Sequence, residues 1–174
     1  MNVIKRGLLK RYYILLSKFA PEKYKEKYPI FLQKIGINIP DDYFEGRKGF
    51  IHVSVQFDAN DYSLISIGKN TTISSEVIFL THDYSIITGL HASGYHKTGH
   101  FLKPIKIGEN CFVGMRSMLL PGTEIGDNVI IGSGSIVKGK LPSNAVYAGN
   151  PARFICSIED WTQRHIKKGD ILEG

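Results

Sequence analysis

A six-residue period of large apolar residues runs through the second half of the chain. Its members are Ile107, Val113, Leu119, Ile125, Ile131 and Val137. An earlier run with the same spacing comprises Ile67, Ile73 and Phe79. Neither the 3.6-residue period of an α-helix nor the two-residue period of a long strand fits this spacing. A unit of one short strand and one turn fits it, with one apolar side chain pointing inward from each unit.

The positions beside the apolar residues support the same unit. Glycine follows the apolar residue in most units, at Gly68, Gly108, Gly114, Gly126 and Gly132. We expect these glycines to permit backbone angles that a side chain would forbid. Stacked coils of such units pair each strand with the next coil and align the inward residues in ladders. The sequence therefore predicts a mainly β fold, a parallel β-helix of hexapeptide repeats.

Residues 80–106 interrupt this period. Phe79 and Ile107 are 28 residues apart, which is not a multiple of six, so we expect a loop to leave the stack of coils here. Long loops in compact domains commonly carry function. Four of the six histidines lie in this one segment: His82, His91, His96 and His100.

The segments on either side of the repeat are predicted to be helical. Apolar residues recur at three- and four-residue spacing through residues 1–34. Ser157 and Asp160 approximate a capping box for a C-terminal helix that ends near Lys168, and we expect this helix to cover the last coil. The chain is thus divided into a basic helical segment (1–48), a β-helix domain (49–156) with the inserted loop 80–106, and a C-terminal helix and tail (157–174).

The net charge of +6 is concentrated at the N-terminus, since residues 1–28 carry eight Lys or Arg against two Glu. This distribution disfavours a nucleic-acid binder. The basic helices are compatible with weak peripheral contact to an anionic membrane, but a helical pair packed on the main domain with a solvated basic face is the favoured interpretation. No apolar run is long enough to span a bilayer and no export signal is recognisable, so we expect a cytoplasmic protein.

Two motifs resemble a known family. The repeats that begin Ile107-Gly-Glu-Asn-Cys-Phe and Ile125-Gly-Asp-Asn-Val-Ile resemble the hexapeptide-repeat acyltransferases. The closing segment Val146-Tyr-Ala-Gly-Asn-Pro-Ala-Arg153 is similar to that of their sugar and xenobiotic O-acetyltransferase branch. The resemblance covers about residues 50–156. It implies left-handed coils, acetyl-CoA as the acyl donor, a sugar or glycan acceptor, no metal, and a homotrimer with active sites between subunits.

A hydroxyl group attacks a thioester efficiently only if a base takes its proton, and histidine suits that task near neutral pH. The resemblance places the catalytic histidine at the start of the interrupting loop, where His82 lies. Asp83 or a backbone carbonyl is expected to orient its ring. A backbone N–H group near Met115 is expected to hold the oxyanion, although Met115 and Arg116 replace the small residues that relatives often have there.

The resemblance also suggests which residues bind the two substrates. Phosphate groups of the donor favour Lys and Arg, although for Lys138 a solvated end of the coil is an equally open interpretation. The predicted donor contacts are Met115, Ser117, Ser133, Gly134, Lys138, Gly139, Ala148 and Arg153. The predicted acceptor contacts, which rest on a looser match because the spacing around Asp58 is irregular, are Gln56, Asp58, Asn60 and Tyr84.

The sequence therefore predicts an acetyl-CoA-dependent O-acetyltransferase that acts on a sugar or polysaccharide-precursor hydroxyl by direct transfer, with His82 as general base. N-acetylation of a nucleotide-linked amino sugar would use the same residues, and the length of the acyl group stays open. The alternative of another class is a zinc-dependent, carbonic-anhydrase-like or non-catalytic β-helix, because His91, His96 and His100 are potential metal ligands. Covering the acceptor pocket is the favoured role for these three histidines.

Overall fold

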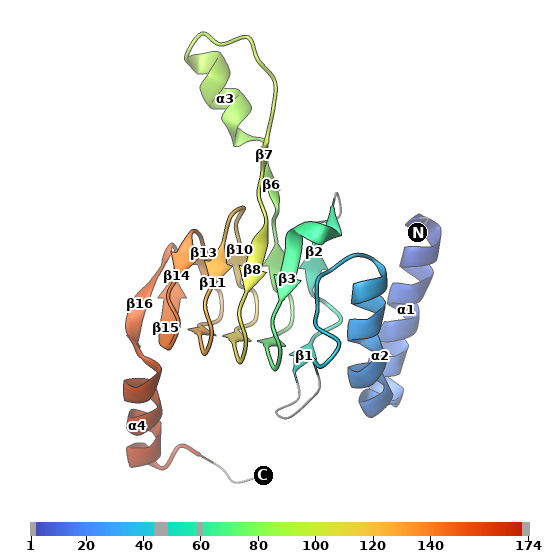
Figure 1. The fold of residues 1–174 in the computed structure, drawn as a ribbon, viewed down its shortest axis with the longest axis vertical. Helices are drawn as coiled ribbons and strands as arrows, with labels where there is room; N and C mark the ends of the chain where they lie inside the picture. Colours follow the sequence, from blue (N-terminus) through green and yellow to red (C-terminus); the bar gives the residue numbers. More distant parts are fainter. Residues whose placement is uncertain (1–2, 44–48, 59–60, 172–174) are drawn as a thin grey trace.

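The computed structural model describes residues 3–43, 49–58 and 61–171, and side chains from Leu8 onward. Short strands form three sheets that make the faces of a three-sided prism (Figure 1). Face 1 has the order β1 (Phe50–Ile51), β4 (Thr72–Ile73), β9 (Phe112–Val113), β12 (Ile130–Ile131), β15 (Ala145–Gly149) and β16 (Ala152–Ser157). Face 2 has the order β13 (Ile136–Val137), β10 (Met118–Leu119), β5 (Ile78–Phe79) and β2 (Gln56–Phe57). Face 3 has the order β14 (Lys140–Leu141), β11 (Glu124–Ile125), β8 (Ile105–Ile107) and β3 (Ile65–Ile67).

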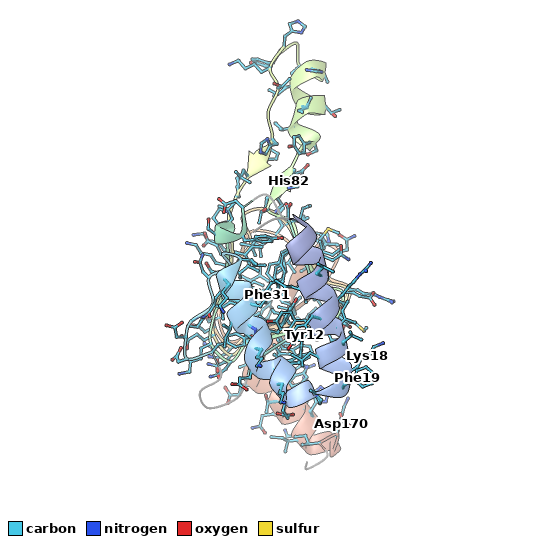
Figure 2. All side chains as sticks on the ribbon, turned by 90° about the vertical axis from the view of Figure 1, so that its right-hand side faces the viewer. Tyr12, Lys18, Phe19, Phe31, His82 and Asp170 are labelled. Carbon is cyan, nitrogen blue, oxygen red and sulfur yellow. The ribbon has the colours of Figure 1, made fainter. Side chains whose placement is uncertain are left out.

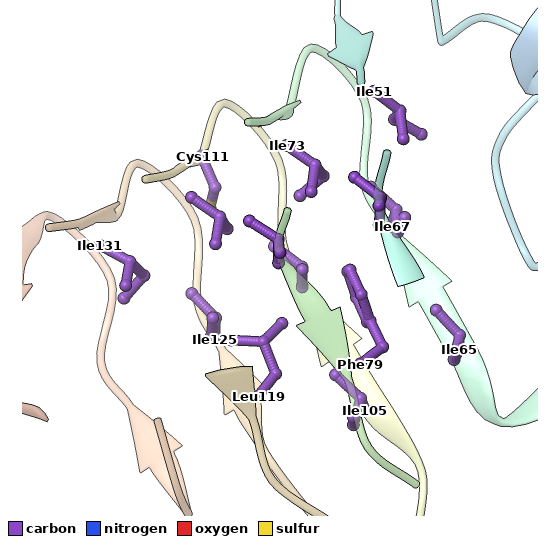
Figure 3. Packing of buried hydrophobic residues seen from close by; sticks show 14 of the residues in the cluster. Ile51, Ile65, Ile67, Ile73, Phe79, Ile105, Cys111, Leu119, Ile125 and Ile131 are labelled. Atoms are coloured by element: carbon purple, nitrogen blue, oxygen red, sulfur yellow. The ribbon is translucent and has the colours of Figure 1, made fainter. Parts of the chain in front are cut away.

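The predicted apolar period forms the interior ladders of this prism. In face 3, Ile67 pairs with Ile107, which pairs with Ile125 on the next coil. In face 2, Phe79 pairs with Leu119 in the same way. These side chains are at most 4% exposed and fill the space between the three faces (Figure 3). The predicted parallel β-helix is therefore confirmed.

The glycines that follow the ladder residues serve the stacking of the coils rather than unusual backbone angles. Gly68, Gly108 and Gly114 are absent from the positive-φ glycines of the described chain. A Cβ atom on Gly68 would lie only 2.5 Å from the carbonyl carbon of Gly108 on the next coil. The expectation from the sequence was wrong in its reason, because the residues that take positive φ are others at the corners, such as Asn110 and Arg116.

The interrupting segment is an ordered arm rather than an irregular loop. We define the arm as residues 82–102. Its two ends, β6 (His82–Asp83) and β7 (Phe101–Leu102), pair antiparallel, and the helix α3 (Ser85–Ala92) lies between them. The arm projects from the prism (Figure 1), and the regular coil resumes at Ile105.

The N-terminal helices α1 (Val3–Phe19) and α2 (Pro21–Lys34) form a hairpin at one end of the prism (Figure 1). Tyr24 and Leu32 of α2 are buried against the first coil, and the Tyr24 hydroxyl donates to the carbonyl oxygen of Ile51 at 2.5 Å. The helix α1 packs on α2 through Tyr13, whose ring lies 5.2 Å from that of Tyr28. Among the described helices, none has both the length and the apolar character needed to cross a bilayer.

Two short segments complete the first coil. Asn38 forms a parallel bridge with Ser66 of β3, so the chain joins the prism before β1. A 3₁₀ turn, η1 (Tyr62–Leu64), leads into β3.

At the other end, the helix α4 (Ile158–Lys168) begins as predicted, because the Ser157 hydroxyl accepts from the backbone N–H of Asp160 at 3.0 Å. The expectation that this helix covers the last coil was wrong. The strand β16 pairs antiparallel with β15 and covers the end of face 1. The helix α4 extends away from the prism and buries none of its residues (Figure 1).

The stacking role of the corner glycines gives a direct test. Replacing Gly68→Ala should lower the free energy of unfolding by about 1–3 kcal/mol, because the added methyl group forces two backbones apart. Denaturant unfolding measures the change. The matched control is Gly89→Ala on α3, where a Cβ meets nothing within 4 Å and alanine favours the helix. Equal stability of Gly68→Ala and the wild type would contradict this account.

Candidate active site

His82 lies where the arm leaves the prism (Figure 2). It follows β5 by way of Leu80 and Thr81, at the corner between face 2 and face 3, which we call the His82 corner. Thr81 is fully buried, and the His82 backbone pairs with Leu102 of β7. The side chain of His82 is 23% exposed, so its ring is held by the protein but is open to solvent on one side.

Asp58 holds the His82 ring. One carboxylate oxygen, Oδ2, contacts His82 Nδ1 and also accepts from the Thr81 backbone N–H and hydroxyl, each at 3.0 Å. Burial raises the pKa of Asp58, but the hydrogen bonds from His82 and Thr81 outweigh it, so this pKa lies below its ordinary value. An ionised Asp58 fixes the proton of His82 on Nδ1, because a carboxylate only accepts. The exposed Nε2 atom is then free to act as a base.

Asp83 does not have the role that the sequence predicts for it. Its Oδ1 atom accepts from the backbone N–H of Ser85 at 2.8 Å, at the start of α3. The carboxylate that orients His82 is therefore Asp58, which the sequence assigned to the acceptor. Only 9% of the Asp58 side chain is exposed, so it positions His82 rather than contacting a substrate.

Two aromatic rings of the arm accompany His82. The ring of Tyr84, which was predicted to contact the acceptor, lies 5.3 Å from the His82 ring. His100 lies 4.8 Å from Tyr84 and 6.4 Å from His82. Tyr84 is 52% exposed, so it is accessible beside the base. The arm thus returns His100 to the site from 18 positions along the chain, a contact that depends on the β6–β7 pairing.

Several predicted donor contacts gather at a different corner. Met115, Ser133 and Gly134 lie between face 1 and face 2, which we call the Met115 corner. The Gly134 N–H donates to the carbonyl oxygen of Met115 at 2.8 Å, and Ala148 lies on the coil beyond. Within the part of the chain that the structure describes, the Met115 N–H has no acceptor. It is thus an open donor, but face 2 separates it from His82.

Ser117 is not available to a donor molecule. Its side chain is fully buried and its hydroxyl donates to the carbonyl oxygen of Gly132 at 3.1 Å. The sequence placed it in the donor site because its position is close to Met115 along the chain. The alternation of inward and outward residues instead directs Ser117 into the prism.

Two of the remaining donor contacts lie at the His82 corner. Lys138 and Gly139 follow β13 there, two coils beyond His82. Hydrogen bonds from Ser85 are the main cause of a lowered pKa at Asp83, and the charge of Lys138 contributes to it. The ammonium group of Lys138 is therefore within electrostatic reach of the arm.

Three further predicted positions are less informative. Arg153 is exposed on β16, and Gln56 is exposed on β2 of face 2. Asn60 lies outside the described residues. The described part of the chain contains no group of three His, Cys, Asp or Glu side chains arranged to hold a metal ion.

Neither cysteine belongs to the site. Cys111 and Cys156 are both buried. Burial raises the pKa of Cys111 to about 11. This thiol is therefore protonated and enclosed at neutral pH, which makes it a poor nucleophile.

Comparison with known proteins agrees with this geometry. Residues 104–139 match the family described as bacterial transferase hexapeptide (six repeats). The chain is 36% identical over 141 residues to the galactoside O-acetyltransferase of Escherichia coli (strain K12), an alignment that covers 77% of this chain and 66% of that protein. It is 34% identical over 142 residues to Protein CapG of Staphylococcus aureus, covering 82% of this chain and 78% of that protein. The chain belongs to the hexapeptide-repeat acyltransferase family.

The same fold occurs in a solved galactoside acetyltransferase in complex with coenzyme A. The TM-score is 0.57 at 24% identity, and the match covers 90% of this chain and 82% of that one. The family membership predicted from the repeats is thus confirmed, and the β-helix is the left-handed one of this acyltransferase family. The chain spans just under two thirds, 66%, of the Escherichia coli relative.

The lowered pKa of Asp58 predicts an acid-dependent contribution to stability. A carboxyl with a depressed folded pKa stabilises the fold above its unfolded pKa of about 3.9, and this is lost as the pH falls through the folded value. The stability gap between the wild type and Asp58→Asn should therefore be largest above about pH 5 and shrink below about pH 4. Urea unfolding at several pH values measures it, with Glu159→Gln on α4 as an exposed control. A gap that stays constant across this range would count against the role of Asp58.

Proposed function

We propose that this protein is an acetyl-CoA-dependent O-acetyltransferase that acts on a hydroxyl group of a sugar or polysaccharide precursor. The observation that carries the proposal is the pairing of His82 Nδ1 with the buried carboxylate of Asp58 at the base of the arm. This arrangement is that of a base oriented by a carboxylate. The relatives support the substrate class, since one is a galactoside O-acetyltransferase and a protein of the same fold binds coenzyme A.

The reaction is a direct transfer in a ternary complex. His82 Nε2 takes the proton of the acceptor hydroxyl as its oxygen attacks the thioester carbonyl carbon. The carbon–oxygen bond forms, the carbon–sulfur bond breaks, and the proton passes from His82 to the leaving thiolate. Asp58 stabilises the imidazolium that exists between these steps. A backbone N–H such as that of Met115 stabilises the oxyanion.

The residues present fit the donor. Coenzyme A supplies the acyl thioester together with several phosphate charges. Lys138 and Arg153 are exposed cations that suit those phosphates. A Cβ atom on Gly134 or Gly139 would meet nothing within 4 Å, so both corners are open to an extended ligand.

A second copy of the chain completes the site in this proposal. Met115 and His82 lie at opposite edges of face 2, separated by about five extended residues or roughly 16 Å, whereas a hydrogen bond reaches about 3 Å. A single chain therefore does not bring the oxyanion donor to the base. A homotrimer in which the Met115 corner of one subunit meets the His82 corner of the next solves this problem.

An apolar groove on face 1 supports the assembly. It has a volume of about 530 Å³ and is lined by Phe112, Ile130 and, from α4, Trp161. Phe112 and Trp161 are 43% and 37% exposed, and α4 has no buried residue. Exposed apolar surface of this kind is typical of subunit interfaces. We place this assembly in the cytoplasm, where a reducing environment suits two free cysteines.

Replacing His82→Ala should lower kcat about 10²–10⁴-fold, because the acceptor proton then has no positioned base. The release of free thiol from acetyl-CoA in the presence of galactosides, maltose and polysaccharide fragments is the measurement. His91→Ala, on the exposed end of α3, is the matched control and should retain wild-type turnover. Unchanged turnover in His82→Ala would rule out the general-base mechanism.

The shared site predicts complementation between two inactive variants. His82→Ala removes the base, and Ser133→Trp blocks the Met115 corner, so neither homotrimer should turn over. In trimers refolded from an equal mixture, one interface of each mixed trimer keeps both corners intact, which should restore about a quarter of wild-type activity. Steady-state thiol release measures this. If confirmed mixed trimers stay inactive, the site does not lie between subunits.

A further inference from the structure

The helix α1 carries an apolar stripe on the side that faces away from the protein. Leu8, Tyr12, Leu15 and Phe19 follow one another at four- and three-residue spacing, so they fall on one line along the helix. They are 61%, 46%, 56% and 82% exposed, respectively. The opposite side of α1, which includes Tyr13, packs on α2. An exposed line of large apolar side chains indicates an interaction surface.

Cations flank this stripe on both sides. Arg11 and Lys18 are exposed on α1 directly beside it. On the other side, Lys27 and Lys34 of α2 line a shallow groove between the two helices, together with Leu9. In the described part of the chain, none of these four cationic side chains forms an ion pair. Their charge is thus available to a partner.

The charge identifies the chemistry of that partner. The helix α1 contains five Lys or Arg and no Asp or Glu. Docking of α1 against a second copy of itself would bring these like charges together, which is unfavourable. A surface that is anionic and has an apolar layer beneath the charge complements both features at once. An amphipathic helix with apolar residues on one face and Lys and Arg beside it is typical of helices that lie in a membrane interface.

We propose that α1 binds the surface of an anionic lipid bilayer. The stripe of Leu8, Tyr12, Leu15 and Phe19 enters the boundary between headgroups and acyl chains, and Arg11, Lys18, Lys27 and Lys34 contact lipid phosphates. The hairpin suits this role because α2 lies between α1 and the prism (Figure 1). In Figure 2, Tyr12, Lys18 and Phe19 lie on the helix nearest the viewer, with no other element in front of it. Binding therefore leaves the β-helix and the His82 corner unchanged, and it does not depend on the proposed acetyl transfer.

Sedimentation of the full chain with lipid vesicles tests the proposal. We expect binding to vesicles of phosphatidylcholine with phosphatidylglycerol and none to phosphatidylcholine alone. Raising the salt from about 0.05 M to about 0.5 M should weaken the binding, since the charges are then screened. The double variant Arg11→Gln/Lys18→Gln should bind about 25-fold more weakly, or about fivefold for each cation removed. Leu15→Gln/Phe19→Gln should lose about tenfold or more.

Matched variants elsewhere on the surface act as controls. Lys167→Gln/Lys168→Gln on α4 removes the same charge, and Ile155→Gln/Ile171→Gln removes two side chains of similar exposure. Both should bind vesicles like the wild type. Circular dichroism and the Tm confirm that each variant is folded. Wild-type binding that ignores phosphatidylglycerol, or α1 variants that bind as tightly as the controls, would overturn the proposal. Self-association that depends on Leu15 and Phe19, without vesicle binding, would assign the stripe to a second copy instead.

Discussion

The close stacking of one coil on the next is the constraint on which the rest of this structure depends. Each strand bonds to the same strand of the neighbouring coil, and the backbones also meet at the corners. A Cβ atom on Gly114 would lie 2.5 Å from the backbone nitrogen of Ser133. The same stacking brings the Gly134 N–H to the Met115 carbonyl and the Thr81 N–H to Asp58. The spacing of the coils therefore sets both the core and the positions of the functional groups.

The arm shows how this architecture accommodates an insertion. A coil contacts only its neighbours, so additional residues at a corner leave the ladders intact. Ile67 pairs directly with Ile107 although the arm lies between them in the sequence. The pairing of β6 with β7 then makes the arm an extension of the corner rather than a loose loop. For this reason Tyr84 and His100 lie beside His82 without any contact to the core.

The sequence predicts the fold well because a ladder of identical spacing has few other solutions, and it finds His82 because the period ends there. It does not find the partner of His82. Asp58 follows Phe57, which pairs with Phe79 across 22 residues, whereas Leu119 and Val137 on the regular coils are 18 residues apart. The irregular first coil hides the register, so the nearer Asp83 was the natural but wrong choice. Burial of Ser117 was equally hidden, since a hydroxyl suits both a ligand contact and a buried hydrogen bond.

The three-sided prism also explains why one chain holds only part of the proposed chemistry. Neighbouring corners are separated by the width of a face, and every residue between them is used in strand pairing. The arm does not bridge this gap, because the β6–β7 ribbon directs it outward from the His82 corner (Figure 1). Base and oxyanion donor therefore meet only if two prisms stand side by side. Assembly then becomes a requirement for catalysis, and the unburied apolar side of α4 is what such an assembly would cover.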